Sequence, residues 1–331
     1  MRLTHSLETS DKLCKCDTVC IDKKSSAELT EAINSMYRWY KQARRCYLYF
    51  NDVKWRTDDP DASRDQLRKS RWFTRGWTLQ ELLAPQFLEC YDKDWISFGD
   101  RDLRADDISD ATGISFAHLK QPQSACVAVK MSWAAKRETS RIEDMAYCLL
   151  GLFDINMPML YGEGKNAFLR LQRKLIKKTA DESIFAWADD EISFPHGMLA
   201  PWPRAFAASN DIIATTDPEA AAVRRPYTIT NQGLELYVNH PTQQACDGQP
   251  LHHFQTITFG LNCESRSAAH GENRYLAIKL HKFGNHWQRV DCDVECLRKP
   301  VVQTTFQDGN RKWLADSLSE MTTIYIKQAG S

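Results

Sequence analysis

The chain has 331 residues, of which 43% are hydrophobic and 26% charged, values typical of a soluble globular protein with about two domains. Its 43 basic and 43 acidic residues give a net charge of zero, so no overall field favours nucleic acid or an anionic membrane. The longest apolar run, residues 145–153, is far shorter than the roughly 20 residues that cross a bilayer, and residues 1–17 lack the apolar core of a secretory signal. We therefore expect a cytoplasmic protein with mostly reduced cysteines, no nucleic-acid partner and no membrane span.

The cysteines and histidines do not follow the spacing of a metal site. Cys14, Cys16 and Cys20 form a C-x-C-x3-C cluster, but a closed zinc site needs a second pair of ligands at a usable spacing. His252 and His253 are adjacent, and neighbours on a strand point to opposite faces. We expect no metal site.

The first predicted helix covers residues 25–43 and lies between two short strands. Ser25 and Glu28 form a capping box, and apolar residues follow at i, i+3, i+4 and i+7. The flanking segments 18–22 and 46–50 are short runs rich in apolar and aromatic residues. A strand, a long helix and a second strand in this order predict a parallel βαβ unit.

A charged segment, residues 51–69, follows and contains Pro60, so we predict a loop there. Next comes a helix over roughly 75–84 and then a strand over 87–91. Glu81 lies on this helix, which follows the loop after a strand. Because ligands of open α/β sheets gather beyond the carboxyl ends of strands, Glu81 is a candidate site residue.

Three further helical stretches are predicted. Residues 101–114 form a helix closed by Gly113, residues 127–153 form two helices broken near Thr139 or Ser140, and residues 162–178 form another helix.

Two patterns in this region do not indicate a catalytic or phosphate-binding site. The adjacent carboxylates of Glu143 and Asp144 are about 100° apart on a helix, so we expect a solvated face there. The "GEGK" run at 162–165 lacks the G-x4-G-K-[ST] spacing of a phosphate loop. It predicts a glycine turn that leads into a helix.

From about residue 190 the sequence becomes β-rich. A domain boundary is expected within 188–225. Alternating β-branched and aromatic residues separated by turn residues predict strands in five segments. These segments are 227–238, 254–264, 274–283, 286–294 and 322–328.

Three blocks in order, residues 17–53, 70–95 and 131–178, resemble the fungal heterokaryon incompatibility (HET) domain family. The resemblance implies a fungal protein of nonself recognition and regulated cell death, with protein partners or self-association. It also implies an α/β fold that begins with an incomplete TIR-like (flavodoxin-like) parallel sheet, because the strand that opens most HET domains is missing before residue 17. On this basis the chain divides into three parts. They are a shortened HET core at 1–100, a helical extension at 101–188 and a β-rich C-terminal module at 189–331.

The resemblance also suggests a role for the helix that carries Glu81. TIR domains that cleave NAD carry a W-x3-E pattern, which Trp77 and Glu81 match. It implies Glu81 as the catalytic residue, because a fixed carboxylate stabilises an oxocarbenium ion. Trp77 would form a wall of the cleft or anchor the helix, and Arg71 and Arg75 would bind diphosphate, remain solvated or pair with nearby acids. No cofactor is required in this hypothesis, and NAD is the candidate substrate.

A second hypothesis is a noncatalytic signalling or scaffold module. In that case the same helix is an assembly surface, and Glu81 forms a structural ion pair or cap. The pattern of residues alone leaves both hypotheses open.

Overall fold

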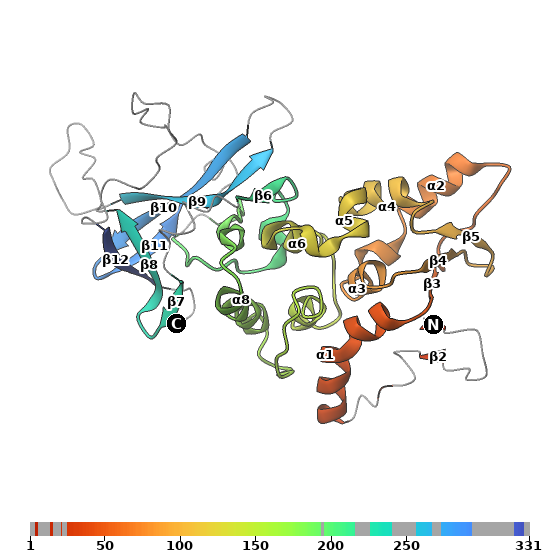
Figure 1. Cartoon of the computed structure of the whole chain (residues 1–331), viewed down its shortest axis with the longest axis horizontal. Helices are drawn as coiled ribbons and strands as arrows, with labels where there is room; N and C mark the ends of the chain where they lie inside the picture. Colours follow the sequence, from red (N-terminus) through yellow and green to blue (C-terminus); the bar gives the residue numbers. More distant parts are fainter. Residues whose placement is uncertain are drawn as a thin grey trace. The chain divides into compact units, whose positions relative to one another are not determined.

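The computed structural model of the chain forms two compact units (Figure 1). The first consists of Met1–Ala125 and Trp133–Leu171, and the second of Cys126–Ser132 and Gln172–Ser331. The chain therefore passes between the units three times, the last time within α8 (Asn166–Lys178). The residues that the structure describes are 4–5, 14–15, 21, 25–192, 195–215, 226–239, 256–266, 273–292 and 321–327. The predicted division at residues 100 and 188 stays a prediction.

The first unit contains a five-stranded mixed sheet. Its order is β2 (Cys14–Lys15), β1 (Thr4–His5), β3 (Cys46–Tyr49), β4 (Leu88–Tyr91) and β5 (Ser97–Asp100). β3 and β4 are parallel, whereas β1 pairs antiparallel with β3 and β5 pairs antiparallel with β4. The predicted strands at 46–50 and 87–91 are confirmed, and so is the mixed α/β class. The predicted strand at 18–22 lies almost entirely outside the described residues, and the TIR-like assignment stays a prediction.

Helix α1 (Ser26–Gln42) confirms the first predicted helix. The Ser25 side chain accepts a hydrogen bond from the Glu28 backbone N–H at 3.3 Å, as expected of an N-cap. Ile33 and Met36 lie on its buried face. The helix therefore begins at its local capping signal and is held by its apolar stripe.

The prediction of a loop at 51–69 is wrong, because the structure has helix α2 (Pro60–Arg68) there. Asp59 caps it, accepting from the Ala62 N–H at 3.2 Å. Pro60 is the first helical residue, where the missing N–H of proline leaves no helix hydrogen bond unmade. The proline thus starts a helix rather than breaking one.

The remaining helices of the first unit are short. Helix α4 (Ala105–Thr112) ends at Gly113 with a φ of 71°, as the sequence predicts. The expected break within 127–153 is wide, because helical structure stops at Ser132 and resumes only with α7 at Asp144. The other described helices of this unit are η1 (Arg71–Thr74), α3 (Thr78–Leu83), α5 (Phe116–Lys120), η2 (Pro122–Ser124) and α7 (Asp144–Tyr147).

The second unit is built on a seven-stranded sheet, which confirms the predicted β-rich region. All pairings are antiparallel except the parallel pair of β11 and β12. The sheet order is β6 (Ile212–Ala214), β9 (Thr256–Arg266), β10 (Asn273–Phe283), β11 (His286–Val290), β12 (Met321–Ile326), β8 (Gly233–Asn239) and β7 (Thr228–Thr230). Its helices are α6 (Val127–Ser132), η3 (Glu182–Phe185) and η4 (Pro203–Phe206), besides the end of α8.

Helix α6 belongs to the second unit because its start is bound there. The backbone N–H of Val127 donates to Oδ2 of Asp181 at 2.7 Å, and that of Ala128 donates to Oγ of Ser183 at 3.0 Å. These side chains satisfy N–H groups that have no partner within the helix.

Candidate functional site

Helix α3 carries the W-x3-E pattern and is buried on all sides. It lies in the crossover between the parallel strands β3 and β4 and contacts α1. All six residues of α3 are buried, and Glu81 is 4% exposed. A ligand therefore cannot reach the Glu81 carboxylate in this conformation without movement of the surrounding elements.

Two buried groups lie within the electrostatic field of Glu81. Burial, together with the charge of Glu81, raises the pKa of the Cys46 thiol on β3 to about 12. Burial lowers the pKa of Arg137 to about 10, against the opposing effects of Cys148 and Glu81. The charge of Glu81 thus acts on a buried cation and a protonated thiol.

Arg137 holds the start of α3 in place. Its Nη1 donates to the carbonyl of Arg75 and to Oγ1 of Thr78, both at 2.9 Å, and its Nε donates to the carbonyl of Trp133 at 3.0 Å. Its Nη2 is buried and has no hydrogen-bond partner among the described residues. The next residue, Glu138, continues the contact, because its backbone bonds to Thr74 and Gly76.

Gln80 links α3 to the segment after α7. Its Nε2 donates to the carbonyl of Cys148 at 2.6 Å, and within the described part of the chain its buried Oε1 has no partner. Burial raises the pKa of the Cys148 thiol to about 12. Three buried polar groups therefore lie at or near α3: the amide of Gln80, the guanidinium of Arg137 and the neutral thiol of Cys148.

Trp77 anchors the N-terminal end of α3. It packs against the cluster of Met36, Tyr40, Cys46 and Ala84, and its side chain is near enough to Asp144 to lower the pKa of that carboxyl. Burial raises the pKa of the Asp144 carboxyl, and the Tyr161 hydroxyl, which donates to Asp144 at 3.0 Å, and the nearby Trp77 side chain partly oppose that rise. These contacts are those of a residue that fixes the helix.

Arg71 and Arg75 lie before α3 and have exposed side chains. The Arg71 backbone N–H donates to Asp52 at 2.8 Å, and the Arg75 carbonyl accepts from Arg137. Neither guanidinium forms an ion pair with another described residue. The structure therefore places the four predicted site residues along one short segment, with Glu81 inside and the two arginine side chains outside.

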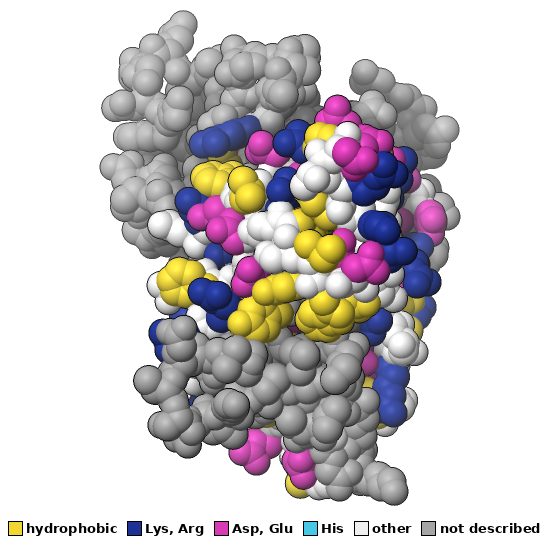
Figure 2. All heavy atoms as spheres, turned by 90° about the vertical axis from the view of Figure 1, so that its right-hand side faces the viewer, with side chains coloured by type: hydrophobic (Ala, Val, Ile, Leu, Met, Phe, Trp, Pro, Cys, Tyr) yellow, Lys and Arg dark blue, Asp and Glu magenta, His cyan; other side chains and the backbone are white. Residues whose placement is uncertain are grey.

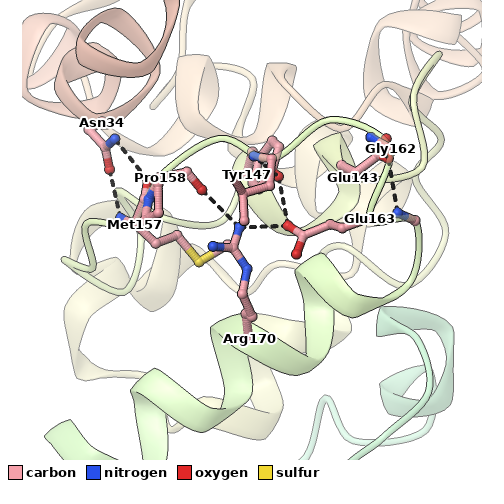
Figure 3. A network of polar contacts seen from close by, with 10 residues as sticks. Asn34, Glu143, Tyr147, Met157, Pro158, Gly162, Glu163 and Arg170 are labelled. Carbon is pink, nitrogen blue, oxygen red and sulfur yellow. Dashed lines mark hydrogen bonds and ion pairs between the residues drawn. The ribbon is translucent and has the colours of Figure 1, made fainter. Parts of the chain in front are cut away.

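The expectation of a solvated face at Glu143 and Asp144 is wrong. Glu143 is 6% exposed, and its Oε1 accepts from the backbone N–H groups of Gly162 at 2.8 Å and Gly164 at 3.0 Å (Figure 3). The N–H groups of Glu143 itself, Gly164 and Gly162 hold the pKa of this carboxyl below its usual range. The glycine N–H groups that a phosphate would need thus bind a carboxylate of the same chain.

A second set of contacts fixes the same loop. The Tyr147 hydroxyl donates to Oε1 of Glu163 at 2.9 Å and accepts from the Leu160 N–H at 2.9 Å (Figure 3). Arg170 on α8 donates to the same oxygen of Glu163 at 2.6 Å and to the carbonyl of Pro158 at 2.8 Å. Burial raises the pKa of Tyr147 to about 12, so the hydroxyl keeps its proton at neutral pH.

Helix α1 joins this network through one amide. Asn34 donates to the Met157 carbonyl and accepts from the Met157 N–H, both at 3.1 Å. These two hydrogen bonds resemble those between paired strands and join α1 to the loop that follows α7. The loop is therefore tied to α1, α7 and α8 of the first unit.

Sequence reasoning missed Arg137, Glu143 and Asp144 as organising residues. The only local signal was the pair of glycines at 162 and 164, whose φ angles of 103° and 58° present two N–H groups to one acceptor. In the described part of the chain, no three His, Cys, Asp or Glu side chains are arranged to hold a metal, and no helix is long and apolar enough for a bilayer. The histidines at 252 and 253 and the cysteines at 16 and 20 lie outside the described residues.

No family model and no solved structure matches the chain. Over 169 residues, 49% of its length, the chain is 46% identical to the vegetative incompatibility protein HET-E-1 of Podospora anserina. The matched part is 12% of the length of that protein. This similarity supports the predicted relationship to fungal heterokaryon incompatibility proteins, whereas the HET domain and its TIR-like core stay predictions.

Proposed function

We propose that this chain acts in vegetative incompatibility, as a signalling module of fungal nonself recognition. The observation that carries the proposal is its 46% identity over 169 residues to a vegetative incompatibility protein. The matched region includes about half of this chain and a small part of that protein. The role is therefore proposed for a module rather than transferred from the whole relative.

The geometry around α3 favours a noncatalytic module. Glu81 is 4% exposed, and Arg137 binds the helix start through two hydrogen bonds. Trp77, just before the helix, packs against a buried cluster on α1 and β3. A helix fixed in this way serves as a rigid support for the surfaces around it.

The partners in this role are proteins, including a second copy of the chain. Exposed hydrophobic side chains in the first unit support this, among them Leu103, Phe87 and Ile96, which are 66%, 58% and 57% exposed. On the side seen in Figure 2, hydrophobic groups lie among intermixed acidic and basic ones. Such mixed surfaces suit protein contacts better than polyanions.

The second candidate function is TIR-like NAD hydrolysis, which the W-x3-E spacing favours. In this candidate Glu81 stabilises the oxocarbenium ion at the ribose, Trp77 walls the cleft, and the exposed Arg71 and Arg75 bind the diphosphate. It requires a second conformation that opens α3 to solvent. Self-association is the event that would supply such a conformation.

Two experiments test these proposals. The full chain is expressed from an inducible promoter in a filamentous fungus, where we expect growth arrest and death of hyphal compartments. Normal growth with the folded chain at a detectable level would refute the incompatibility role. Purified chain is then incubated with NAD. The noncatalytic module predicts no nicotinamide release above buffer, whereas the hydrolase predicts release that Glu81→Gln abolishes without loss of folding.

A further inference from the structure

A cavity of about 400 Å³ that is open to solvent lies at one end of the seven-stranded sheet of the second unit, and most of the residues around it are exposed. Two hairpin turns and the end of β12 surround it. Its lining residues are Asn231, Gln232, Asn285, His286, Tyr325 and Lys327. Neither the proposed function nor the similarity to the incompatibility protein assigns a role to this cavity.

The turns present their amide side chains on fixed backbone. Asn231 and Gln232 are the two residues between β7 and β8, and Gly284 and Asn285 are the two between β10 and β11. Gly284 has a φ of 60° and Gly233 a φ of 130°, conformations that favour glycine. Two-residue turns of this kind fix the backbone of the three amide residues, whose side chains are exposed.

The strands place the other three lining side chains on one face of the sheet. Ile326 is buried, so its neighbours Tyr325 and Lys327 point to the opposite face. On β11 the buried residue is Trp287, which pairs with Ile326, so His286 lies on the same outer face as Tyr325. The register of two adjacent strands thus brings a phenol, an imidazole and an ammonium group together.

The described side chains around the cavity include a positive charge and no negative one. Lys327 supplies a positive charge, three amides and a phenol supply donors and acceptors, and no carboxylate is among the described lining residues. None of the six side chains makes a hydrogen bond or ion pair within the part of the chain that the structure describes. Their polar groups are available to a ligand, and the open cavity has room for a small molecule that stays partly in solvent.

We propose that this cavity binds a small anionic, hydroxyl-rich molecule of the sugar phosphate or sugar acid class. The anionic group lies at Lys327, which forms a charge-assisted hydrogen bond with it. The hydroxyl groups lie at Asn231, Gln232 and Asn285, since a primary amide both donates to and accepts from a hydroxyl. The proposal stands independently of the role in vegetative incompatibility.

Titration calorimetry of the full chain tests this proposal with glucose 6-phosphate, gluconate, glucose and inorganic phosphate as probes. We expect one or both sugar anions to bind at least about tenfold more tightly than glucose and inorganic phosphate, and the tighter one identifies the anionic group. Lys327→Gln should weaken that binding about tenfold or more, because a hydrogen bond to a charged group is lost. The matched control is Lys93→Gln, an exposed lysine of the first unit, which should stay within about twofold of wild type.

Three results would overturn the proposal. One is that no probe binds the wild-type chain. Another is that inorganic phosphate binds as tightly as the sugar anions, because the amides would then recognise nothing. The third is that Lys327→Gln and Lys93→Gln have equal effects, which would show a general charge effect. Thermal unfolding of each variant verifies that the exposed substitution leaves the fold intact.

Discussion

The hydroxyl of Tyr147 offers a direct test of the network that holds the loop after α7. Tyr147→Phe removes one oxygen that donates to Glu163 and accepts from the Leu160 N–H, both at 2.9 Å (Figure 3). The ring of Tyr147 is fully buried, so its apolar packing is unchanged. The substitution therefore isolates two hydrogen bonds.

The expected loss can be summed from these two bonds. A neutral bond contributes about 0.5–1.5 kcal/mol and a bond to a charged acceptor about 1.5–3 kcal/mol, so we expect about 2–4.5 kcal/mol in total. Glu163 keeps its contact with Arg170 at 2.6 Å, which prevents a larger loss from a bare carboxylate. The Leu160 N–H is left without its acceptor.

Urea unfolding measures the global loss, and amide hydrogen exchange at Leu160 measures the local opening. The matched control is Tyr49→Phe, whose hydroxyl donates to the Lys93 carbonyl at 3.0 Å at an exposed position. It should cost less than about 1 kcal/mol. The reasoning is refuted if Tyr147→Phe is as stable as this control and exchange at Leu160 is unchanged.

Three other substitutions test the packing and charge of the first unit. Gly151→Ala should destabilise by about 1–3 kcal/mol or more, because its new Cβ would lie 2.0 Å from Cβ of Tyr37. Gly260→Ala, which meets nothing within 4 Å, is the control, and equal melting temperatures would contradict the clash. The pKa of Glu143 is lowered in the folded chain, so its stabilising effect is complete above the unfolded pKa of about 4.3 and is lost as the pH falls toward the folded value. Glu143→Gln should therefore lower the melting temperature at pH 7 and reduce the further decrease in melting temperature below about pH 5. A decrease as steep as that of the wild type would refute this. Arg137→Met should cost roughly 2–4 kcal/mol in urea unfolding, because two carbonyls and a hydroxyl lose a charged donor, and a fully stable variant would show that these bonds are dispensable.

The sequence predicts the elements whose causes are local. The capping box at Ser25 and Glu28 and the apolar stripe behind it are enough to define α1, and short aromatic runs define β3 and β4. Helix α2 was missed because Pro60 has opposite meanings inside a helix and at its first residue. The Asp59 cap directly before it is the signal that distinguishes the two cases.

Features that depend on contacts between residues far apart in the sequence could not be predicted. The carboxylate of Glu143 and the N–H of Gly162 are separated by 19 positions, and no periodic pattern relates them. Burial of Glu81 was also hidden, because a carboxylate in an apolar segment suggests an exposed face. Arg137, whose pKa responds to the charge of Glu81, is 56 positions further along the sequence.

The triple passage of the chain between its two units restricts how the protein can be divided. A cut after Leu171 would leave α6 attached to the first unit, while Asp181 and Ser183, which bind its first N–H groups, would depart with the rest. Neither unit is a contiguous stretch of sequence. An exchange of everything after Leu171 with a diverged relative therefore combines α6 of one chain with the rest of the second unit of another, and this unit is transferred whole only when residues 126–132 are exchanged with it.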